Sequence, residues 1–517
     1  MKAEADLHFL QGINQLVGHG WPYSPEMAGE PGWRMYAAGA FNTHNPWWFA
    51  MPNLAAYLQR VSFALRQGAP ANDVALLLPN DDAWASFAVK GRWSGSTKAE
   101  FNAGGNDVSI DENMQALLGR VVIPQVLDSG FNLDFIDADA IDSLGISYPV
   151  LVLPAVERLP LATYQKIERY ARHGGIVIAT CRLPSAAPGL MNADSESRQI
   201  QEISRRLFRD SGAVGHFVEN EGKLGASLAA SSKPDVMFSP SAPEIGFIHR
   251  KLDGTELYFI ANTSNHPIAT AAKFRNAKSH AEWWDAFSGK ISPVVNAAQI
   301  EIVLAPYESR LIVFNDAPSG TERKKKSGRP AKSQPRDIDL SSDWKLTFGA
   351  ANQTIPMATL HSWSDEQPFR YYSGEVTYLK TIDLNAEAVS RNSFVLDFGE
   401  GTPLAKPDPL PEFNMQAYLD SPIREAAEVF VNAARAGVVW HPPYEIDITR
   451  FVKAGKNELR IIVGNTAINA LAGKSLPDYR LLKDRYGERF VPQGMDHLQP
   501  LPSGLVGKVR LRITPVH

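Results

Sequence analysis

The residues best suited to chemistry gather in one short loop near the start of the chain. His19, Trp21 and Tyr23 lie within HGWPYSP (19–25), directly after the apolar segment INQLVG (13–18). An imidazole can hydrogen-bond hydroxyl groups, and flat aromatic faces can stack on a sugar ring. The two prolines of the loop restrict its backbone. The loop is therefore predicted to contact a polyhydroxylated ligand, and the alternative is that these side chains pack beneath it.

A second set of candidates precedes the next predicted helix. Asn45, Trp47 and Trp48 stand at the start of PWWFAMPNLAAYLQRVSFALRQG (46–68). Asn45 could contact the ligand or act as the N-cap of that helix, since asparagine is favoured at N-caps. Trp47 is a candidate binding residue, and one of the two tryptophans is expected to pack against the body of the domain.

Few carboxylates lie near this loop. Glu26 is the best local candidate for a general acid, a general base or a metal ligand, although a loop glutamate ordinarily stays in solvent. Glu4 and Asp6 fall in the first turn of a predicted helix, where acidic side chains favour the helix dipole anyway. A pairing of Glu26 with one of them would be exposed and poorly positioned. The chain has no G-x-S-x-G motif and no histidine pair with zinc spacing.

These residues require elements that hold them in place. A helix at 2–12, a strand at 13–18, the loop and a helix at 46–68 form the repeat unit of a (β/α) barrel, whose active site lies where the strands end. One unit cannot close a barrel. Residues 1–70 are therefore predicted to be the C-terminal remnant of a barrel in a longer enzyme.

An incomplete barrel would leave apolar helix faces uncovered. Such a patch favours association, either with the missing N-terminal half or with a second copy of the chain. The residues on these faces are Leu7, Leu10, Leu54, Leu58, Val61 and Leu65.

Residues 71–212 alternate strand and helix signals, which predicts a doubly wound α/β domain. VALLLP (74–79) is a continuous apolar run of the kind that parallel sheets bury. A helix at 111–130 is expected to kink or split at Pro124. No G-x-G-x-x-G follows the first strand, which argues against a nucleotide site. Cys181 ends the apolar run GIVIATC and is predicted to be a buried thiol.

From residue 213 the apolar period changes from 3.6 to 2. Residues 213–315 are predicted to form a β-sandwich, with a hairpin that turns at Asp253-Gly254. Trp283 and Trp284 are expected in its core, with Asp285 at a turn.

The last part of the chain again reads as β structure. Residues 316–337 are rich in Pro, Gly, Ser and basic residues and are predicted to be a linker. Residues 338–517 carry short strands at even spacing, which predicts a jelly-roll. One of these strands is EVFVNAARAGVVW (428–440). Trp440, His441, Tyr444 and Asp447 could form a sugar cleft there, or Trp440 could pack while Asp447 starts a turn.

Composition excludes several classes of function. The 517 residues carry a net charge of −4, a pI of about 6.3 and a mean hydropathy of −0.21, so nothing drives the chain toward nucleic acid or an acidic membrane surface. No apolar stretch is long enough to span a membrane. The compartment stays open, because an upstream start would allow a periplasmic or secreted protein and a start at Met1 would favour the cytoplasm.

Several long motifs, in order, resemble the α-L-rhamnosidases of glycoside hydrolase family 106. They are GINQLVGHGWPYSP, PGWRMYAAGAFNTHNPWW, LAAYLQRVSFALRQGAPANDVALLLP, DGTELYFIANTS followed by WWDAFSG, and LPSGLVGKVRL. A local stretch at 429–466 also resembles the sugar-binding, galactose-binding-like module of many glycoside hydrolases.

The resemblance implies an inverting glycosidase that removes terminal α-L-rhamnosyl units and uses a calcium ion at the sugar. Inversion needs two carboxylates roughly 6.5–9.5 Å apart. In this family they are expected on barrel strands before residues 13–18, so catalysis by this chain alone would be incomplete. The alternative is a non-catalytic carbohydrate-binding or scaffold protein.

Overall fold

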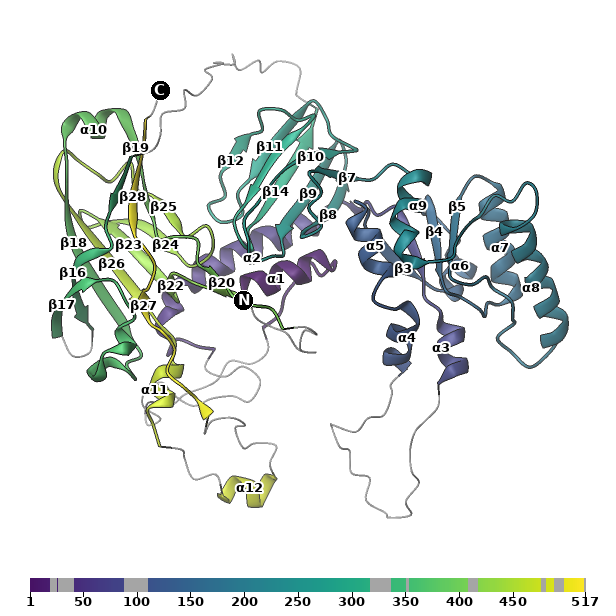
Figure 1. Ribbon diagram of the computed structural model, residues 1–517, viewed down its shortest axis with the longest axis horizontal. Coiled ribbons are helices and arrows are strands. Elements are labelled where there is room, and N and C mark those ends of the chain that lie inside the picture. Colours follow the sequence, from purple (N-terminus) through teal and green to yellow (C-terminus); the bar gives the residue numbers. More distant parts are fainter. Residues whose placement is uncertain are drawn as a thin grey trace.

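The computed structural model describes residues 1–18, 26, 41–87, 110–316, 336–349, 353–407, 417–475, 480–487 and 497–515. These residues form three lobes in a row, with an α/β lobe at one end, a β lobe in the middle and a second β lobe at the other end (Figure 1). The chain is thus of mixed α/β type with several sheets. His19, Trp21 and Tyr23 lie outside the described residues, as does nearly all of the predicted linker 316–337.

The middle lobe contains two antiparallel sheets. The larger has the order β1-β8-β9-β14-β11-β12 and the smaller the order β13-β10-β7. The strands are β1 (Ala69–Pro70), β7 (Val236–Ser239), β8 (Ile245–Leu252), β9 (Thr255–Asn262), β10 (Ile268–Phe274), β11 (His280–Trp284), β12 (Ile291–Pro293), β13 (Ile300–Leu304) and β14 (Ser309–Asn315).

Strands β9 and β14 are buried on both faces. Tyr258 and Ile260 of β9 belong to the core between the two sheets, whereas Leu257 and Phe259 face the opposite way. That second face packs against α1 (Lys2–Leu10) and α2 (Met51–Leu65), which lie beside the larger sheet in Figure 1. The apolar run 257–261 of β9 is thus explained, because a strand covered on both faces buries side chains at consecutive positions.

The helix faces predicted to be uncovered are therefore mostly covered. Val61 and Leu65 are buried against the larger sheet, and Leu10 and Leu58 pack at the edge of the same cluster. Leu54 is also buried, and Leu7 is the member of the set that stays exposed, at 44%. The association predicted from uncovered helix faces is therefore not needed to bury most of these residues, because the larger sheet of the middle lobe packs against them.

The strand predicted at 13–18 does not form. This segment has irregular backbone, with Ile13 42% and Val17 84% exposed, while Leu16 packs on the helix-and-sheet cluster. A β-strand needs a neighbouring strand for its hydrogen bonds. No strand among the described residues pairs with 13–18, so the apolar pattern lacks the partner that would make it a strand.

The α/β lobe has a parallel five-stranded sheet with the order β3-β2-β4-β5-β6. The strands are β2 (Val74–Leu77), β3 (Leu133–Ile136), β4 (Val150–Pro154), β5 (Ile176–Thr180) and β6 (His216–Val218). One face packs on α6 (Ala138–Leu144), α7 (Leu161–Arg172) and α8 (Ala193–Phe208). The other packs on α4 (Ile110–Leu118), α5 (Val122–Asp128) and α9 (Leu224–Ser231).

The helix predicted at 111–130 is divided, but upstream of Pro124. The break between α4 and α5 contains Gly119, whose φ of 65° ends the first helix. Pro124 lies in the first turn of α5, where a missing amide hydrogen costs no helical hydrogen bond.

The second β lobe also contains two antiparallel sheets around one core. One has the order β15-β28-β19-β25 and the other β17-β16-β18-β26-β23-β24. The strands are β15 (Arg336–Asp339), β16 (Ser342–Phe348), β17 (Gln353–Thr359), β18 (Glu375–Leu384), β19 (Asn392–Asp397), β23 (Ala426–Val431), β24 (Ala434–Val439), β25 (Glu445–Asp447), β26 (Gly455–Gly464) and β28 (Arg510–Pro515).

Shorter elements complete the described chain. Two small ladders pair β20 (Thr402–Pro403) with β21 (Leu419–Asp420), and β22 (Ile423–Arg424) with β27 (Gly504–Leu505). The remaining helices are η2 (Pro46–Ala50), α3 (Asn80–Ser86), η3 (Glu221–Lys223), η4 (Trp363–Asp365), η5 (Gln367–Phe369), α10 (Ala386–Arg391), α11 (Ile468–Ala472) and α12 (Arg480–Tyr486). None of the described helices has the length and apolarity needed to cross a membrane.

Candidate functional site

A cavity of about 490 Å³ lies where α1, η2, α2, the middle lobe and the second β lobe meet. We call it the aromatic cavity. Its lining includes Trp47, Tyr307, Trp440, His441 and Tyr444 together with one carboxylate, Glu425. Segments far apart in the sequence thus converge on one space, which is large enough for a small ligand.

Trp47 reaches this cavity because η2 is tied to the second β lobe. The preceding residue Asn45 is buried, and its Oδ1 accepts a hydrogen bond from the amide of Ala467 at 2.9 Å. Gly464 lets the two segments approach, since a Cβ there would lie 2.3 Å from the carbonyl oxygen of Pro46. Asn45 occupies the N-cap position of η2 without a side-chain cap bond, so its side chain joins two lobes instead of capping.

A stack of rings holds Trp440 and His441 in place. The His441 ring stacks on Phe287 at 3.6 Å, and Phe287 stacks on Tyr57 at 4.5 Å. Trp440 meets His441 edge-on at 4.7 Å and Tyr57 at 6.5 Å. The wall of the cavity is therefore continuous with the apolar cluster under α2, which restricts how far these two side chains can move.

A buried polar group supports the same wall. Lys2 Nζ donates to Asp6 at 2.7 Å, to the carbonyl oxygen of Tyr307 at 2.6 Å and to Ser309 at 3.1 Å. The hydroxyl of Tyr57 donates to the same carboxylate. Burial and the Asp6 charge raise the pKa of Tyr57. Asp6 is therefore fully engaged in structure, which removes it as a partner for Glu26 in catalysis.

Burial and the nearby charge of Lys2 lower the pKa of His441 to about 3. Its ring is neutral at physiological pH. Nδ1 lies 2.7 Å from the carbonyl oxygen of Pro442, which can only accept, so Nδ1 carries the proton and Nε2 is left as an acceptor. His441 thus offers an uncharged acceptor.

The pKa of Glu425 is shifted upward, whereas that of His441 is shifted downward. Burial raises the pKa of its carboxyl, against the lowering effect of Arg424 and of the chain's amino terminus. Its own amide donates to the carbonyl oxygen of Gly464 at 2.7 Å, which fixes the backbone at this point. A raised pKa widens the pH range over which the carboxyl is protonated and can donate a hydrogen bond.

Aromatic faces with a few polar groups suit a sugar, whose ring has apolar faces and whose hydroxyls both donate and accept. The same lining is not equipped for inverting hydrolysis by itself. Inversion needs two carboxylates, and among the described lining residues Glu425 is the single carboxylate.

The structure brings some of the predicted residues together and separates others. Trp47, Trp440, His441 and Tyr444 share the cavity, although the sequence suggested two unrelated groups. Asp447 is exposed and accepts from the amide of Thr449 at 2.9 Å, which is a turn contact. Glu26 is exposed. His19 and Trp21 lie outside the described residues, so their predicted roles stay predictions.

Glu425 and Tyr307 were missed by sequence reasoning. Glu425 stands in SPIREAAEVF, at the start of an ordinary alternating strand, and Tyr307 in a short turn between β13 and β14. Neither segment carries a motif. Both residues reach the cavity through the packing of one lobe against another, which no local pattern encodes.

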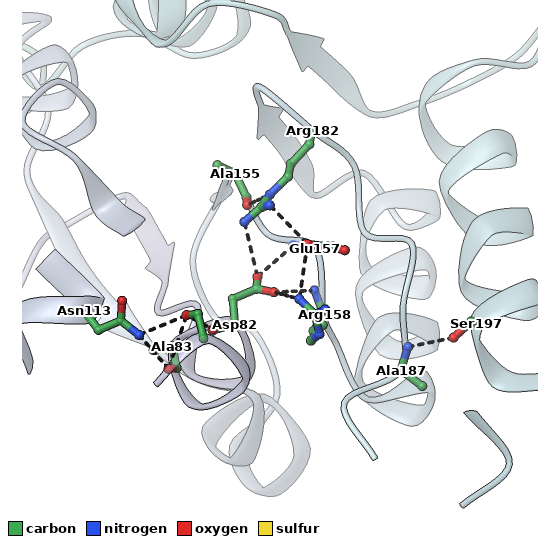
Figure 2. A network of polar contacts seen from close by, with 10 residues as sticks. Asp82, Ala83, Asn113, Ala155, Glu157, Arg158, Arg182, Ala187 and Ser197 are labelled. Carbon is green, nitrogen blue, oxygen red and sulfur yellow. Dashed lines mark hydrogen bonds and ion pairs between the residues drawn. The ribbon is translucent and has the colours of Figure 1, made fainter. Parts of the chain in front are cut away.

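The crevice where doubly wound sheets usually bind ligands is filled by the protein's own side chains (Figure 2). Between β2 and β4, Asp82 is 2% exposed and accepts from the amides of Glu157 and Arg158 at 2.8 and 3.1 Å. Arg158 Nη1 also donates to Asp82 at 3.1 Å, and Arg182 approaches to 4.0 Å. The buried carboxylate of Asp82 would repel a phosphate at this point.

Cys181 is exposed, so the prediction of a buried thiol was wrong. Strand β5 ends at Thr180, and Cys181 is the first residue beyond the sheet, with a left-handed φ of 59°. Partial burial and the charge of Glu221 raise the pKa of the thiol, which keeps it in the less reactive protonated form.

The resemblance noted in the sequence implies a calcium ion. Within the described residues, no group of three or more His, Cys, Asp or Glu side chains could hold a metal ion.

Comparisons with known proteins find similarity to carbohydrate-active enzymes. The family model for α-L-rhamnosidases of glycoside hydrolase family 106 matches residues 1–298. The solved structure of a rhamnosidase from Novosphingobium sp. PP1Y superposes with a TM-score of 0.71 at 22% identity, covering 99% of this chain and 46% of that one. A Formosa agariphila protein named as a candidate β-glucuronidase is 24% identical over 337 residues, 61% of this chain and 25% of that protein.

The chain therefore spans less than half the length of each of these two proteins. At this level of identity the solved structure supports the fold, and the family model supplies the assignment. Because that model covers more than half of the 517 residues, the chain belongs to glycoside hydrolase family 106.

Proposed function

We propose that this chain is part of an enzyme that hydrolyses terminal α-L-rhamnosides with inversion, and that the aromatic cavity contacts the carbohydrate. The observation that carries the proposal is the convergence of Trp47, Trp440 and His441 on one cavity in a member of this family. Rings of this kind stack on sugars, and the neutral imidazole of His441 offers an acceptor to a hydroxyl.

The architecture is part of the same proposal. Residues 1–70 would be the end of a (β/α) barrel, and the positions of α1 before and η2 and α2 after the segment that contains His19 and Trp21 support this. Residues 71–212 would be a doubly wound domain, 213–315 a sandwich, and 338–517 a jelly-roll of the galactose-binding-like kind, joined through the linker 316–337. The boundary at 212 has to move, because β6 (His216–Val218) pairs with β5 in the parallel sheet and α9 (Leu224–Ser231) packs on that sheet. The sandwich strands therefore begin with β7 (Val236–Ser239).

The catalytic pair is the part that these residues do not supply. Inverting hydrolysis needs a general acid, a general base and room for a water between them. Glu425 is the single carboxylate among the described lining residues of the cavity, and Glu26 is exposed. We therefore assign the pair to other parts of a longer enzyme, with this chain forming one wall of the sugar site. Calcium belongs to the same proposal on family resemblance alone, and no step is derived through it.

The test is hydrolysis of 4-nitrophenyl α-L-rhamnopyranoside. The purified chain is assayed alone and together with a separately expressed segment that carries the preceding barrel strands of a homologous enzyme. We expect no turnover by the chain alone and turnover by the pair, reduced when the chain carries Trp47→Ala. Turnover by the chain alone that disappears in Glu26→Gln would overturn the assignment of the pair. Saturable rhamnoside binding with no turnover in either arrangement would favour the non-catalytic alternative.

A further inference from the structure

A cluster of ionisable side chains is buried in the middle lobe, next to the place where the α/β lobe joins it. Its centre is His249 of β8, whose side chain is fully buried. Nδ1 of the ring lies 2.7 Å from Asp235 Oδ2, and Nε2 lies 2.9 Å from Glu256 Oε2. Asp235 and Glu256 are buried as well. One imidazole ring is thus held between two carboxyl groups, away from the residues that line the aromatic cavity.

The surroundings of Asp235 suit an ionised carboxylate. The hydroxyl of Tyr258 donates to Asp235 Oδ1 at 2.9 Å, and the Tyr258 ring stacks on His249 at 3.9 Å. Burial raises the pKa of Tyr258, so this hydroxyl keeps its hydrogen and acts as the donor. Arg275 Nη2 lies 3.8 Å from the same carboxylate oxygen. Both oxygens of Asp235 therefore face groups that can donate.

Two hydrogens on the His249 ring satisfy this geometry. A carboxylate oxygen can only accept, whereas a neutral imidazole has one N–H group and one lone pair. A neutral ring would therefore turn its lone pair toward an oxygen of Asp235 or Glu256. The protonated ring donates to both, and such charge-assisted hydrogen bonds are about twice as strong as neutral ones. The alternative is a neutral ring that accepts from a protonated Glu256.

The balance of charge favours the protonated ring over this alternative. The titratable and charged groups that face the ring or its partners are Asp235 before β7, Glu256 and Tyr258 on β9, Arg275 after β10 and Asp73 before β2. Arg275 pairs with Asp73, so the imidazolium is the cation in contact with both remaining carboxylates. Buried carboxylates without a cation are strongly unfavourable.

The same residues hold the root of the α/β lobe. The chain enters this lobe after β1 and returns to the middle lobe at β7. At the entry, the amide of Ala71 donates to the carbonyl oxygen of His249 at 3.1 Å. At the return, the amide of Asp235 donates to the carbonyl oxygen of Gly130 at 2.9 Å. A displacement of His249 or Asp235 would therefore disturb both strands of the connection.

We propose that His249 is an imidazolium that locks the root of the α/β lobe to the middle lobe, and that loss of its proton loosens this junction. The neutral ring would repel one of its two carboxylates, and a shift of Asp235 would release the bond to Gly130. The α/β lobe itself would stay folded, because its sheet has apolar clusters of its own. The proposal does not depend on rhamnoside hydrolysis.

Nitrogen NMR of the full chain labelled in its histidine rings tests the protonation state. At about pH 7 we expect one ring with both nitrogens protonated, whose signals disappear in His249→Gln and move in Glu256→Gln. His441 is an internal reference, since its neutral ring carries a proton on Nδ1 alone. A His249 ring protonated on a single nitrogen would overturn the proposal, because the second proton would then belong to Glu256. If His249→Gln fails to fold, Glu256→Gln identifies the ring.

Hydrogen exchange tests the loosening. The protection of segments 69–73 and 233–236, corrected for intrinsic exchange and compared with β4, should fall about tenfold or more between pH 6 and pH 9, as the ring loses its proton. In Glu256→Gln the amide can donate to a neutral ring, so the protection should stay constant with pH. Glu301→Gln, an exposed carboxylate on β13, is the matched control and should behave like the native chain.

Two results would contradict the loosening. One is an equal loss of protection in Glu256→Gln and in the native chain, which would show that His249 is not its cause. The other is protection that stays constant up to pH 9, whether or not the ring titrates.

Discussion

Arg424 and Glu425 are consecutive residues whose side chains line different cavities. Arg424 lines a cavity of about 580 Å³ on the second β lobe, and Glu425 lines the aromatic cavity, with Ser421 in the wall of both. The charge of Arg424 lowers the pKa of Glu425, but burial outweighs it and the net shift is upward. The two cavities are thus separate in space and joined through one short stretch of backbone.

Glu425 should make stability fall as pH rises. Its pKa in the folded chain lies above the ordinary value of 4.5, so the fold binds this proton more tightly than the unfolded chain does. The resulting stabilisation is complete below the unfolded value and is lost as pH rises through the folded value. The difference in unfolding free energy between the native chain and Glu425→Gln, measured by urea from pH 4 to 8, should therefore shift in favour of the variant. A difference that stays constant with pH would contradict the raised pKa.

His441 should make stability fall as pH decreases. Its pKa falls from 6.5 to about 3 on folding, so the fold prefers the neutral ring. The stabilisation is complete above 6.5 and is lost progressively as pH falls toward 3. His441→Gln keeps a polar group without this titration. The native chain should lose stability relative to that variant between pH 7 and pH 4, as followed by thermal unfolding, and parallel curves would show that the ring is not held neutral.

Asn45→Ala should destabilise the junction of η2 with the second β lobe. The change removes a buried acceptor and leaves the amide of Ala467 unpaired, which costs about 1–3 kcal/mol. The matched control is Asn296→Ala, whose exposed side chain accepts from the amide of Ala298 at 3.1 Å and should cost about 0.5 kcal/mol or less. Urea unfolding measures both, and equal costs would mean that the bond to Ala467 is of no consequence.

Lys2→Met should be the more severe change. It leaves the carboxylate of Asp6 buried beside Tyr57 with its cation gone, and breaking a buried pair in this way costs about 3–5 kcal/mol. The exposed pair of Arg391 and Glu387 supplies the comparison, since Arg391→Gln should cost no more than about 1 kcal/mol. If the double variant Lys2→Met, Asp6→Leu is no more stable than Lys2→Met alone, the cost does not come from the unpaired carboxylate.

The sequence was sufficient to predict structure where neighbouring residues alone decide the backbone conformation. The hairpin of β8 and β9 turns at Asp253-Gly254, where Gly254 has a φ of 66°, and the dipeptide predicts this. The segment 428–440 was read as one strand but is a hairpin of β23 and β24 that turns at Asn432-Ala433. Both turn residues have positive φ, 51° and 64°, and an alanine there hides the signal that a glycine would give.

The sequence pattern was insufficient where the local structure depends on contacts with a distant segment. Residues 13–18 have the composition of a buried strand but no pairing partner among the described residues. Trp47 was a candidate from its sequence, but its cavity depends on Trp440 and Glu425, nearly four hundred residues away. The motifs identified the family, but the residues around the cavity are brought together by packing between segments that are far apart in the sequence.

The double burial of β9 and β14 has a consequence for how such genes can be rearranged. Their outward face, with Leu257, Phe259 and Leu311, is covered by α1 and α2, which precede the α/β lobe in the chain. The sandwich is therefore discontinuous in sequence, with its cover encoded before an intervening domain and its strands after it. A recombination event between them would produce a sheet with a bare apolar face and a pair of helices with nothing to rest on. Residues 1–70 and 236–315 should thus be inherited as one unit, whatever is inserted between them.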